Sequence, residues 1–545
     1  MNLNFDLNLF VETSKKIYEK AKNEKRLIDN PSFEELRRLT ENESGIKKTK
    51  FGNLETESEP TSRSAMFTRN SIDFEFGKDE LDLLKNCEQS LKNEKLVSID
   101  RIVGNLESKI TVRLIVPLKF VHVAYGGGSL FAPIEKTLEI PTYEVIMFFD
   151  DSFESNKEKS LPDKDITIRL AMLENGRMIK ICRNSNYIGE YKKGVFAAQD
   201  WRAKFDNIGI FLHAGCREDY LQSSHGEYIY VRSLLIALSA NGKTTTTCKV
   251  LGRKDREKSW LIQDDGGILM KDGSFKGFEY GGIFVKSEGV NPSNQIETYY
   301  GLLKPNTFLE NVHMDDNGDF DFFNFERTSN GRAVIQRKDF MHASSSIDAP
   351  RIDNIILITR GPIIPAISKL THEQATALMI IGQSMESSAG DPTKAGKIRN
   401  EFFYDPFVSG DRAEHANLFY DILKNLPHIN CFLINTGGIG EGRHYKEITI
   451  EHTLGILDSL FRGGLEDWTE STTGLMVPKS IRTVDQVYLH PESLYSKEEF
   501  LIKQKEIEEI RYSIISRYDN KLNPKILNVF KKPSRHKKKK ISSID

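Results

Sequence analysis

The chain has 545 residues, too many for one compact hydrophobic core, so two or more lobes are expected. Its 39% hydrophobic and 28% charged residues are ordinary for a globular protein. The formal net charge of -2 gives no reason to expect nucleic acid or an anionic membrane as a partner. The 5 cysteines are scattered and lack metal-binding spacing, which favours reduced thiols over a disulfide framework.

Targeting signals are not evident in the sequence. The N-terminus has no basic region followed by an apolar core, and the longest apolar runs fall far short of the ~20 residues that a membrane span requires. We therefore expect a soluble cytoplasmic enzyme. The lysine-rich segment 535–540 belongs to a basic tail, residues 526–545, that we expect to be solvated.

The N-terminal part mixes helical and strand patterns. Residues 11–40 have a helical pattern and residues 41–62 are polar and predicted to form a loop. Alternating apolar runs at 110–116 and 143–149 predict strands, with the glycines at 126–128 as a turn between them. Residues 152–164 are predicted to be a charged loop, and residues 200–207 a boundary between lobes.

Strands and helices alternate from residue 208 onward. Residues 354–359 predict a buried strand, and residues 429–437 a second strand that ends in a glycine turn. Residues 370–379 predict a helix with Thr371 as its N-cap. Residues 496–530 are charged and helical in pattern.

Residues 228–247 are the most informative stretch. An apolar strand is followed by Gly242, Lys243 and Thr244, which predicts a loop whose N–H groups hold phosphates, with the lysine on the terminal phosphates and the threonine on a metal. A second apolar strand ends in Asp264 and Asp265, carboxylates suited to the same metal. The alternative is a strand, turn and helix with a solvated lysine.

Other segments share their order and spacing with a known family. They are residues 30–36, 61–64, 187–196, 212–213, 263–265, 309–312, 331–332, 365–371 and 435–437. With them, the chain resembles the ATP-dependent phosphoenolpyruvate carboxykinases from about residue 30 to about residue 468. The resemblance implies a two-lobed α/β fold. Residues 1–207 would form a mixed α/β substrate-side lobe, and residues 208–525 a P-loop lobe that binds nucleotide and metal.

The same resemblance implies a metal site. It places the Mn²⁺ ligands on Lys193, His213 and Asp265, with Mg²⁺ on Thr244 and a metal-bound water on Asp264. Mn²⁺ accepts imidazole nitrogen and carboxylate oxygen, whereas a lysine can ligate only as the neutral amine, which requires a pKa lowered by burial or a nearby cation. Taken alone, His213 is more typical of a core histidine after an apolar strand than of a metal ligand.

The substrate and nucleotide sites follow from the same resemblance. Oxaloacetate would contact Arg63, Tyr187 and Lys193, and the catalytic residues would be Lys193, Lys243, Asp264 and Arg332. Arginine suits these positions because its planar fork binds carboxylate or phosphate through two hydrogen bonds; for Arg63 a solvated loop arginine remains the alternative. The nucleotide would contact Ser239, Ala240, Asn241, Gly242, Lys243, Thr244, Thr245, Glu297, Arg332 and Thr453.

Three departures from the family pattern concern the nucleotide. Two glycines expected in the loop are Ala237 and Ala240, Glu447 stands where a base-stacking arginine is expected, and residues 390–396 lack the expected lid sequence. A loop requires glycine only at positive φ or where a side chain would strike the ligand. We therefore predict negative φ at both alanines, because positive φ costs an L-residue about 1–2 kcal/mol.

The leading hypothesis is the conversion of oxaloacetate and ATP to phosphoenolpyruvate, carbon dioxide and ADP, with Mn²⁺ and Mg²⁺. Loss of the carboxylate leaves an enolate, and its oxygen attacks the γ-phosphate. The alternatives are a kinase of the same fold with another carboxylate or hydroxyl acceptor, and a nucleotide-binding homologue without catalysis. We expect a monomer with small-molecule partners only.

Overall fold

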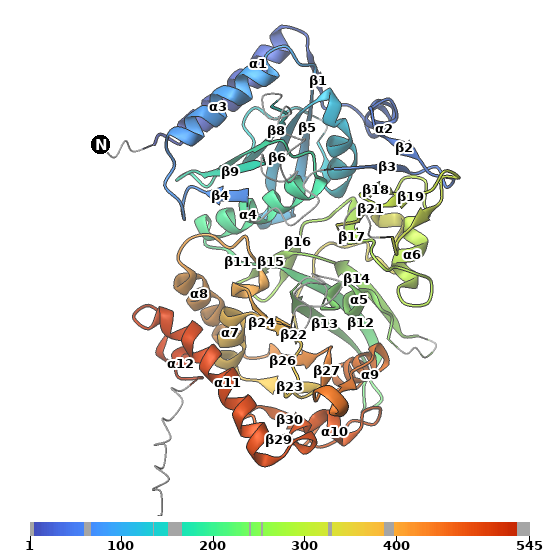
Figure 1. Ribbon diagram of the computed structural model, residues 1–545, viewed down its shortest axis with the longest axis vertical. Coiled ribbons are helices and arrows are strands. Elements are labelled where there is room, and N and C mark those ends of the chain that lie inside the picture. The colour runs from blue at the N-terminus through green and yellow to red at the C-terminus, as the bar shows by residue number, and fades with distance from the viewer. Residues whose placement is uncertain are drawn as a thin grey trace, which may run out of the picture.

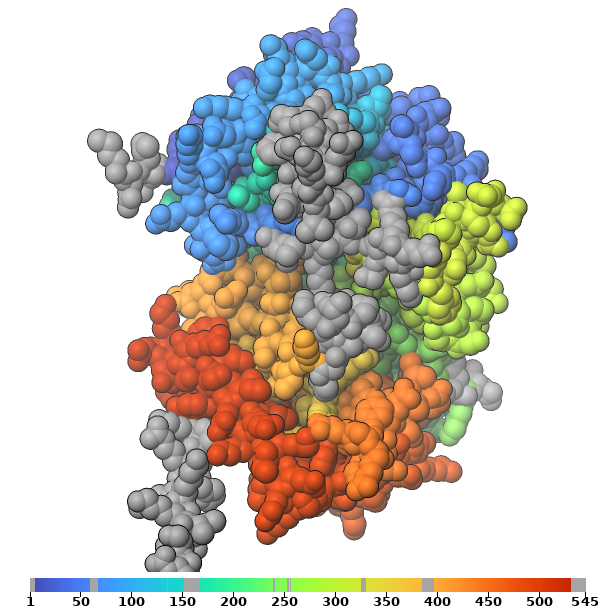
Figure 2. Space-filling view, in the orientation of Figure 1, coloured from blue at the N-terminus to red at the C-terminus, as the bar shows by residue number. Residues whose placement is uncertain are grey.

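A computed structural model describes residues 5–58, 67–134, 136–150, 166–238, 241–251, 254, 256–324, 330–385 and 397–530. These residues form a mixed α/β structure with two large sheets (Figure 1). Figure 2 shows the N-terminal residues in blue at one end of the molecule and the C-terminal residues in red at the other. Within this described part, no helix combines the length and the apolar character needed to cross a membrane.

The N-terminal sheet is covered by helices on both faces. Alternate strand residues point to opposite faces, so Ile115 packs with α1 (Asn8–Asn23) and α3 (Lys78–Leu91), while its neighbours Leu114 and Val116 pack with α4 (Ile188–Phe205). Its strand order is β1 (Leu27–Asp29), β5 (Leu96–Val103), β6 (Ile110–Pro117), β8 (Tyr143–Phe148), β10 (Met178–Arg183), β9 (Thr167–Met172) and β4 (Thr68–Asn70), with β7 (Ala132–Pro133) beside β5.

The second large sheet contains three adjacent parallel strands, β13, β22 and β26, whose carboxyl ends therefore meet at one edge. Its strand order is β14 (Lys258–Gln263), β12 (Ala214–Gln222), β13 (Tyr228–Ala237), β22 (Asn354–Thr359), β26 (Asn430–Asn435), β23 (Ile367–Leu370), β30 (Met476–Pro478) and β29 (Trp468–Glu470). Helices α7 (His372–Ile381) and α8 (Arg412–Asn425) cover one face, and α9 (Ile450–Phe461) covers the other.

Helix α4 and two smaller sheets connect the large sheets. Helix α4 contacts β8 and β10 on one side and β11 and β15 on the other. The smaller sheets are β11 (Gly209–Leu212), β15 (Gly267–Met270) and β16 (Phe275–Gly277), and β17 (Gly282–Lys286), β21 (Arg332–Gln336), β18 (Phe308–Glu310), β3 (Leu54–Thr56) and β2 (Lys47–Lys48).

Short hairpins and helices complete the described chain. The hairpins are β19 (His313–Met314) with β20 (Phe320–Asp321), β24 (Gln383–Met385) with β25 (Ile398–Asn400), and β27 (Gly438–Ile439) with β28 (Lys446–Glu447). The remaining helices are α2 (Phe33–Glu41), α5 (Lys243–Cys248), α6 (Ile296–Leu302), α10 (Gln486–Leu489), α11 (Lys497–Ile515) and α12 (Pro524–Leu527).

Several sequence predictions are confirmed. Strand β22 has the predicted bounds, and β26 lies within the predicted segment. Helix α7 begins after Thr371, whose side chain accepts a hydrogen bond from the Gln374 N–H as an N-cap does. Residues 497–515 are helical. Helix α4 ends at Phe205, within the stretch 200–207, and the division into lobes at that stretch stays a prediction.

Three predictions in the N-terminal part are wrong. The glycines at 126–128 form no simple turn but lie in a buried helical segment, Val123–Gly127 continued by Gly128–Leu130. A Cβ on Gly126 would lie 2.6 Å from Ile188, so glycine allows the close approach to α4. The predicted loop at 41–62 contains β2 and β3, and the helical stretch at 11–40 contains β1, because pairing with distant strands outweighs local composition. Residues 59–62, 152–164 and 531–545 lie outside the described residues.

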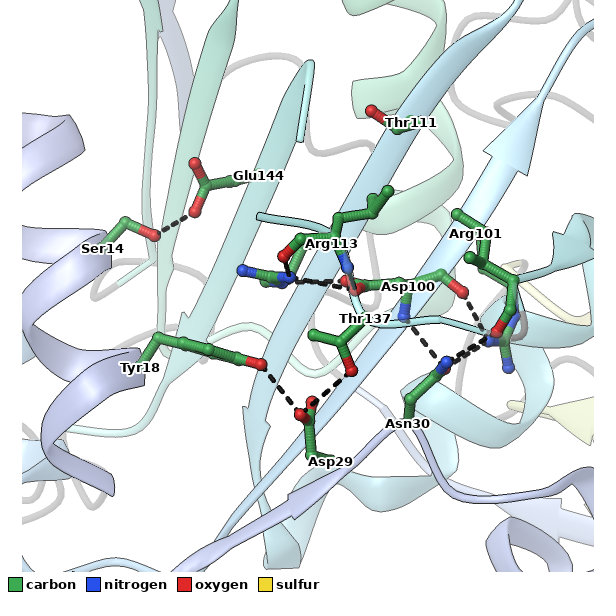
Figure 3. A network of polar contacts seen from close by, with 12 residues as sticks. Ser14, Tyr18, Asp29, Asn30, Asp100, Arg101, Thr111, Arg113, Thr137 and Glu144 are labelled. Carbon is green, nitrogen blue, oxygen red and sulfur yellow. Dashed lines mark hydrogen bonds and ion pairs between the residues drawn. The ribbon is translucent and has the colours of Figure 1, made fainter. Parts of the chain in front are cut away.

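A buried ion pair anchors the N-terminal sheet (Figure 3). Arg113 donates from Nε and Nη2 to the two carboxylate oxygens of Asp100, at 2.8 and 3.0 Å. The guanidinium carbon of Arg113 lies 4.2 Å from the ring centroid of Tyr18, whose hydroxyl donates to Asp29. The backbone N–H of Leu138 also donates to Asp100, at 2.7 Å. The pair therefore connects α1, β1, β5 and β6.

We expect Asp100→Asn to lower the free energy of unfolding by about 3–5 kcal/mol, because it leaves the Arg113 charge buried without its counterion. Urea unfolding followed by tryptophan fluorescence would measure the change. The control is Asp82→Asn, which removes an exposed carboxylate near Lys85 and should change stability by less than about 1 kcal/mol. Equal effects of the two variants would contradict this role of Asp100.

A second ion pair predicts a pH dependence. The hydrogen bonds from Arg462 lower the pKa of Glu257 to about 2, from an ordinary value of 4.5. The folded-state value is depressed, so the stabilisation is complete above the ordinary value and is lost as pH falls from there towards about 2. The stability difference between the native protein and Glu257→Gln should therefore shrink between pH 5 and pH 3 in urea titrations. A difference that does not change with pH would contradict this assignment.

Candidate active site

The predicted phosphate loop lies at the edge where the parallel strands end, which is where α/β sheets bind ligands. Strand β13 ends at Ala237, and α5 begins at Lys243. Beside them, β22 is followed by Arg360 and β26 by Thr436, whose hydroxyl donates to the carbonyl of Asn241 at 2.9 Å. This hydrogen bond fixes the start of α5 to the neighbouring strand.

The backbone explains one of the missing glycines. Ala237 is a fully buried residue of β13 and is not among the residues with positive φ, as predicted. Gly242, which the chain retains, has φ 90° in the left-handed region. The position that requires glycine therefore has it. Ser239 and Ala240 lie outside the described residues.

A cavity of about 440 Å³ opens at this edge. Its walls come from α4, α5, β11, the end of β14, β17, β21 and the segment around residues 399–407. Residues predicted from the sequence that line it are Tyr187, Lys193, His213, Gly242, Lys243, Thr244, Thr245, Asp264, Asp265 and Arg332. Segments far apart in sequence are thus brought to one cavity.

Asp265 is the centre of a charged cluster. His213 Nε2 lies 2.8 Å from Asp265 Oδ1, and Lys243 Nζ forms an ion pair with the same oxygen. Lys192 Nζ lies 2.6 Å from Oδ2 and 3.1 Å from Glu279. Burial opposes ionisation, but Lys192, Lys243 and His213 outweigh it and hold the pKa of Asp265 well below its usual range. Asp265 is therefore a carboxylate anion at neutral pH.

Asp264 differs from its neighbour. It accepts a hydrogen bond from the Thr244 hydroxyl at 3.2 Å. Burial and then the charge of Asp265 raise the pKa of Asp264 to about 7. Two adjacent carboxylates are thus held with different proton affinities, a pattern found where one of them exchanges protons.

Lys193 lines the cavity, whereas the preceding lysine does not. Burial and then the Arg332 guanidinium lower the pKa of Lys193 to about 8. Its Nζ lies 5.3 Å from the ring centroid of Phe407, and among the described residues it forms no ion pair with Asp265. Lys192 and Lys193 are successive residues of α4, about 100° apart around the helix, and therefore point to different partners. A lowered pKa increases the neutral amine that a metal requires.

Tyr187 and Arg332 form the opposite wall. Arg332, the first residue of β21, pairs through Nη1 with Glu288 Oε1 at 3.2 Å. Burial raises the pKa of Tyr187 to about 12, although the Arg332 charge acts in the other direction. The phenol is therefore neutral and is held in the field of a cation.

Three predicted residues do not line the cavity. Glu297 lies 3.8 Å from Lys249, the Thr453 hydroxyl donates to Thr449, and the Asn241 side chain donates to Ser384. Arg63 is outside the described residues. Cavity residues that the sequence analysis missed are Glu288, Arg360, Arg399, Glu401, Tyr404 and Phe407.

The missed residues had different sequence signals. Lys192 stands beside the predicted metal ligand, and Arg360 directly follows a predicted strand, so both positions could have been found. Tyr404 contributes its backbone carbonyl, which lies 3.3 Å from His213 Nδ1. No side-chain pattern reveals a contact of this kind.

The side chains suit a divalent cation of mixed ligation. In the described part of the chain, no group of three or more His, Cys, Asp or Glu residues is arranged to hold a metal. A site here therefore depends on an amine nitrogen beside His213 and Asp265, and Lys193 has the lowered pKa that this requires. The histidine is oriented through its second ring nitrogen, as metal-binding histidines are.

A lysine and a threonine after a strand, facing paired aspartates, are typical of enzymes that transfer phosphoryl groups. The chain belongs to the phosphoenolpyruvate carboxykinase family, whose model matches residues 25–487. It is 26% identical over 401 residues to "Phosphoenolpyruvate carboxykinase (ATP)" of Aeropyrum pernix. The matched region covers 73% of this chain and 76% of that protein. The chain is also 26% identical over 444 residues to the protein of that name from Wigglesworthia glossinidia brevipalpis, covering 78% and 75%. The match to the Campylobacter jejuni protein is 25% identical over 424 residues.

Proposed function

We propose that this protein converts oxaloacetate and ATP to phosphoenolpyruvate, carbon dioxide and ADP. Membership of the family and the names of its relatives support this reaction. The observation that carries it is the convergence of Lys193, His213, Lys243, Asp264 and Asp265 on one cavity. Cations and carboxylates there match a reaction in which an enolate forms and a phosphoryl group is then transferred.

The ATP side of the cavity is formed by α5 and β21. Lys243 neutralises charge on the triphosphate, and Arg332 binds the transferred phosphate. Thr244 and the Asp264 carboxylate bind Mg²⁺ or a water on it. Retention of glycine at position 242, where φ is positive, supports a loop still shaped for phosphate.

The substrate side is formed by α4 and β11. Lys193, His213 and Asp265 bind Mn²⁺, and Tyr187 contacts oxaloacetate, with Arg63 as a further substrate ligand. A bound divalent cation supplies positive charge beside the developing enolate oxygen. The chain's own residues orient the keto acid and exclude water, so that the enolate oxygen faces the γ-phosphate.

We propose that the two large sheets belong to lobes with different functions. Residues 1–207 form a substrate-side lobe and residues 208–525 a P-loop lobe for nucleotide and metal. The predicted basic tail at 526–545 starts too early, because Ile526 is fully buried and the apolar residues of 527–530 pack against the core of the second large sheet. All 5 cysteines are free and buried, which supports a cytoplasmic location. We propose a monomer.

A direct assay tests the reaction. Purified protein is mixed with oxaloacetate, ATP, Mn²⁺ and Mg²⁺, and phosphoenolpyruvate is measured by ³¹P nuclear magnetic resonance. Formation of phosphoenolpyruvate only when ATP, oxaloacetate and metal are all present is expected. ATP consumption with another carboxylate or a hydroxyl acceptor, but not with oxaloacetate, would instead indicate a kinase of this fold.

A further inference from the structure

A second cavity lies under the C-terminal helix α11 and shares no lining residue with the candidate active site. Its volume is about 270 Å³. Helix α11 packs on α7 (Figure 1), and the turn between β29 and β30 and residues 529–530 close the remaining sides. This volume lies just below the roughly 300–1,000 Å³ typical of ligand pockets, so it suits a molecule much smaller than a nucleotide.

The walls combine an apolar surface with two opposite charges. Leu378, Leu475 and Ile507 provide part of the apolar surface. The charges are Glu508 and Arg511, both on α11 and three residues apart, so they lie on the same face of the helix. Both side chains are partly buried, so the cavity presents a cation and an anion beside an apolar surface.

Neither charge has an ion-pair partner among the described residues. Arg511 donates from Nε to Gln383 Oε1 at 3.2 Å, and its guanidinium carbon lies 5.3 Å from the ring centroid of Phe530. Glu508 accepts a hydrogen bond from Gln504 at 2.9 Å. Burial lowers the pKa of Arg511 to about 10, although Tyr404 and then the Glu508 charge act in the other direction.

A third polar group beside them lacks a partner. The amide nitrogen of Gln383, next to its contact with Arg511, is buried and has no hydrogen-bond acceptor in the described structure. A buried donor without an acceptor costs about 1–3 kcal/mol. Gln383 does not itself line the cavity, so Arg511 is the donor there that an anionic group would reach.

We propose that this cavity binds an α-amino acid with an apolar side chain. Its carboxylate pairs with Arg511, its ammonium group pairs with Glu508, and its side chain packs on Leu378, Leu475 and Ile507. A guanidinium accommodates a carboxylate in two-point geometry. The adjacent Glu508 repels a phosphate or a dicarboxylate, so a zwitterion compensates both charges at once.

Isothermal titration calorimetry of the full chain without ATP, oxaloacetate or metal tests this site. L-leucine is compared with 4-methylpentanoate, which lacks the ammonium group, and with 3-methylbutylamine, which lacks the carboxylate. Leucine should bind at micromolar to millimolar concentration, and each analogue about tenfold or more weakly, since a hydrogen bond to a charged group is worth about 1.5–3 kcal/mol. Because no turnover is measured, failure here leaves the proposed reaction untouched.

Variants on α11 assign the contacts. Arg511→Gln should weaken leucine and 4-methylpentanoate by about tenfold to a hundredfold. Glu508→Gln should weaken leucine, which loses the partner of its ammonium group, and should not weaken 4-methylpentanoate, a pattern that misfolding would not produce. Lys505→Gln, on the same helix but outside the cavity, is the control. The proposal would be overturned if neither leucine nor phenylalanine bound. It would also be overturned if leucine bound the native protein and Arg511→Gln with equal affinity.

Discussion

Lys243→Ala is expected to abolish phosphoenolpyruvate formation from oxaloacetate and ATP, with a loss of at least about 10²–10³-fold in rate. The lysine begins α5, lines the cavity and forms an ion pair with Asp265, so its ammonium group lies where triphosphate charge would accumulate. Its removal takes away a charge that stabilises the transition state of phosphoryl transfer. Rates are measured with phosphoenolpyruvate as the product.

The same variant separates the two halves of the reaction. Decarboxylation of oxaloacetate to pyruvate needs charge near the enolate but not transfer to the γ-phosphate, so part of it should survive and is detected with lactate dehydrogenase. The fold should also survive, because Lys192 and His213 still compensate Asp265. Lys249→Ala is the control, since Lys249 follows α5 but does not line the cavity. Near-normal phosphoenolpyruvate formation by Lys243→Ala would show that this loop is not the phosphate site.

Local sequence signals predicted the second large sheet better than the first part of the chain. Strand β22 and helix α7 carry uninterrupted apolar runs and a capping threonine, and both were identified within a residue or two. Strand β3 is short and includes Glu55, yet all three of its residues are buried. It exists because it pairs with β18, more than 250 residues away in sequence, and no local pattern encodes such pairing.

The candidate site was predicted residue by residue with uneven success. Motif residues at the start of a helix or just after a strand, such as Lys243 and Asp265, line the cavity. Glu297 on α6 and Thr453 on α9 do not line the cavity. Whether a residue of these helices reaches the cavity depends on where the helix lies in the fold, which the motif does not encode. Arg360 lines it through its position at the end of a parallel strand, which requires the strand order to be known.

Arg360 lines the cavity, and its pKa is influenced by Glu447 of the segment that departs from the family pattern. Burial lowers the pKa of Arg360. Tyr445 and then Glu447, which is exposed on β28, act in the other direction and offset part of this effect. Arg360 is thus a cation at the cavity wall near an acid that replaces the expected arginine.

His213→Gln is expected to weaken Mn²⁺ binding by at least about tenfold to a hundredfold. Removing a residue that only hydrogen-bonds to a metal ligand already costs about this much affinity, and His213 is proposed as a ligand itself. His213 directly follows β11 and is oriented by two contacts, Nε2 to Asp265 at 2.8 Å and Nδ1 to the Tyr404 carbonyl at 3.3 Å. Glutamine can keep a hydrogen bond to Asp265 but offers an amide in place of the imidazole nitrogen that transition metals prefer.

The electron paramagnetic resonance signal of free Mn²⁺ measures this affinity without ATP or oxaloacetate, so the result does not depend on turnover. The thermal midpoint of His213→Gln should stay close to that of the native protein, because the histidine is partly exposed to the cavity rather than part of the core. His225→Gln, in an exposed turn between β12 and β13, is the matched control and should bind Mn²⁺ normally. An unchanged Mn²⁺ affinity in His213→Gln would mean that the histidine only positions Asp265, and the metal would then have to be held by other residues.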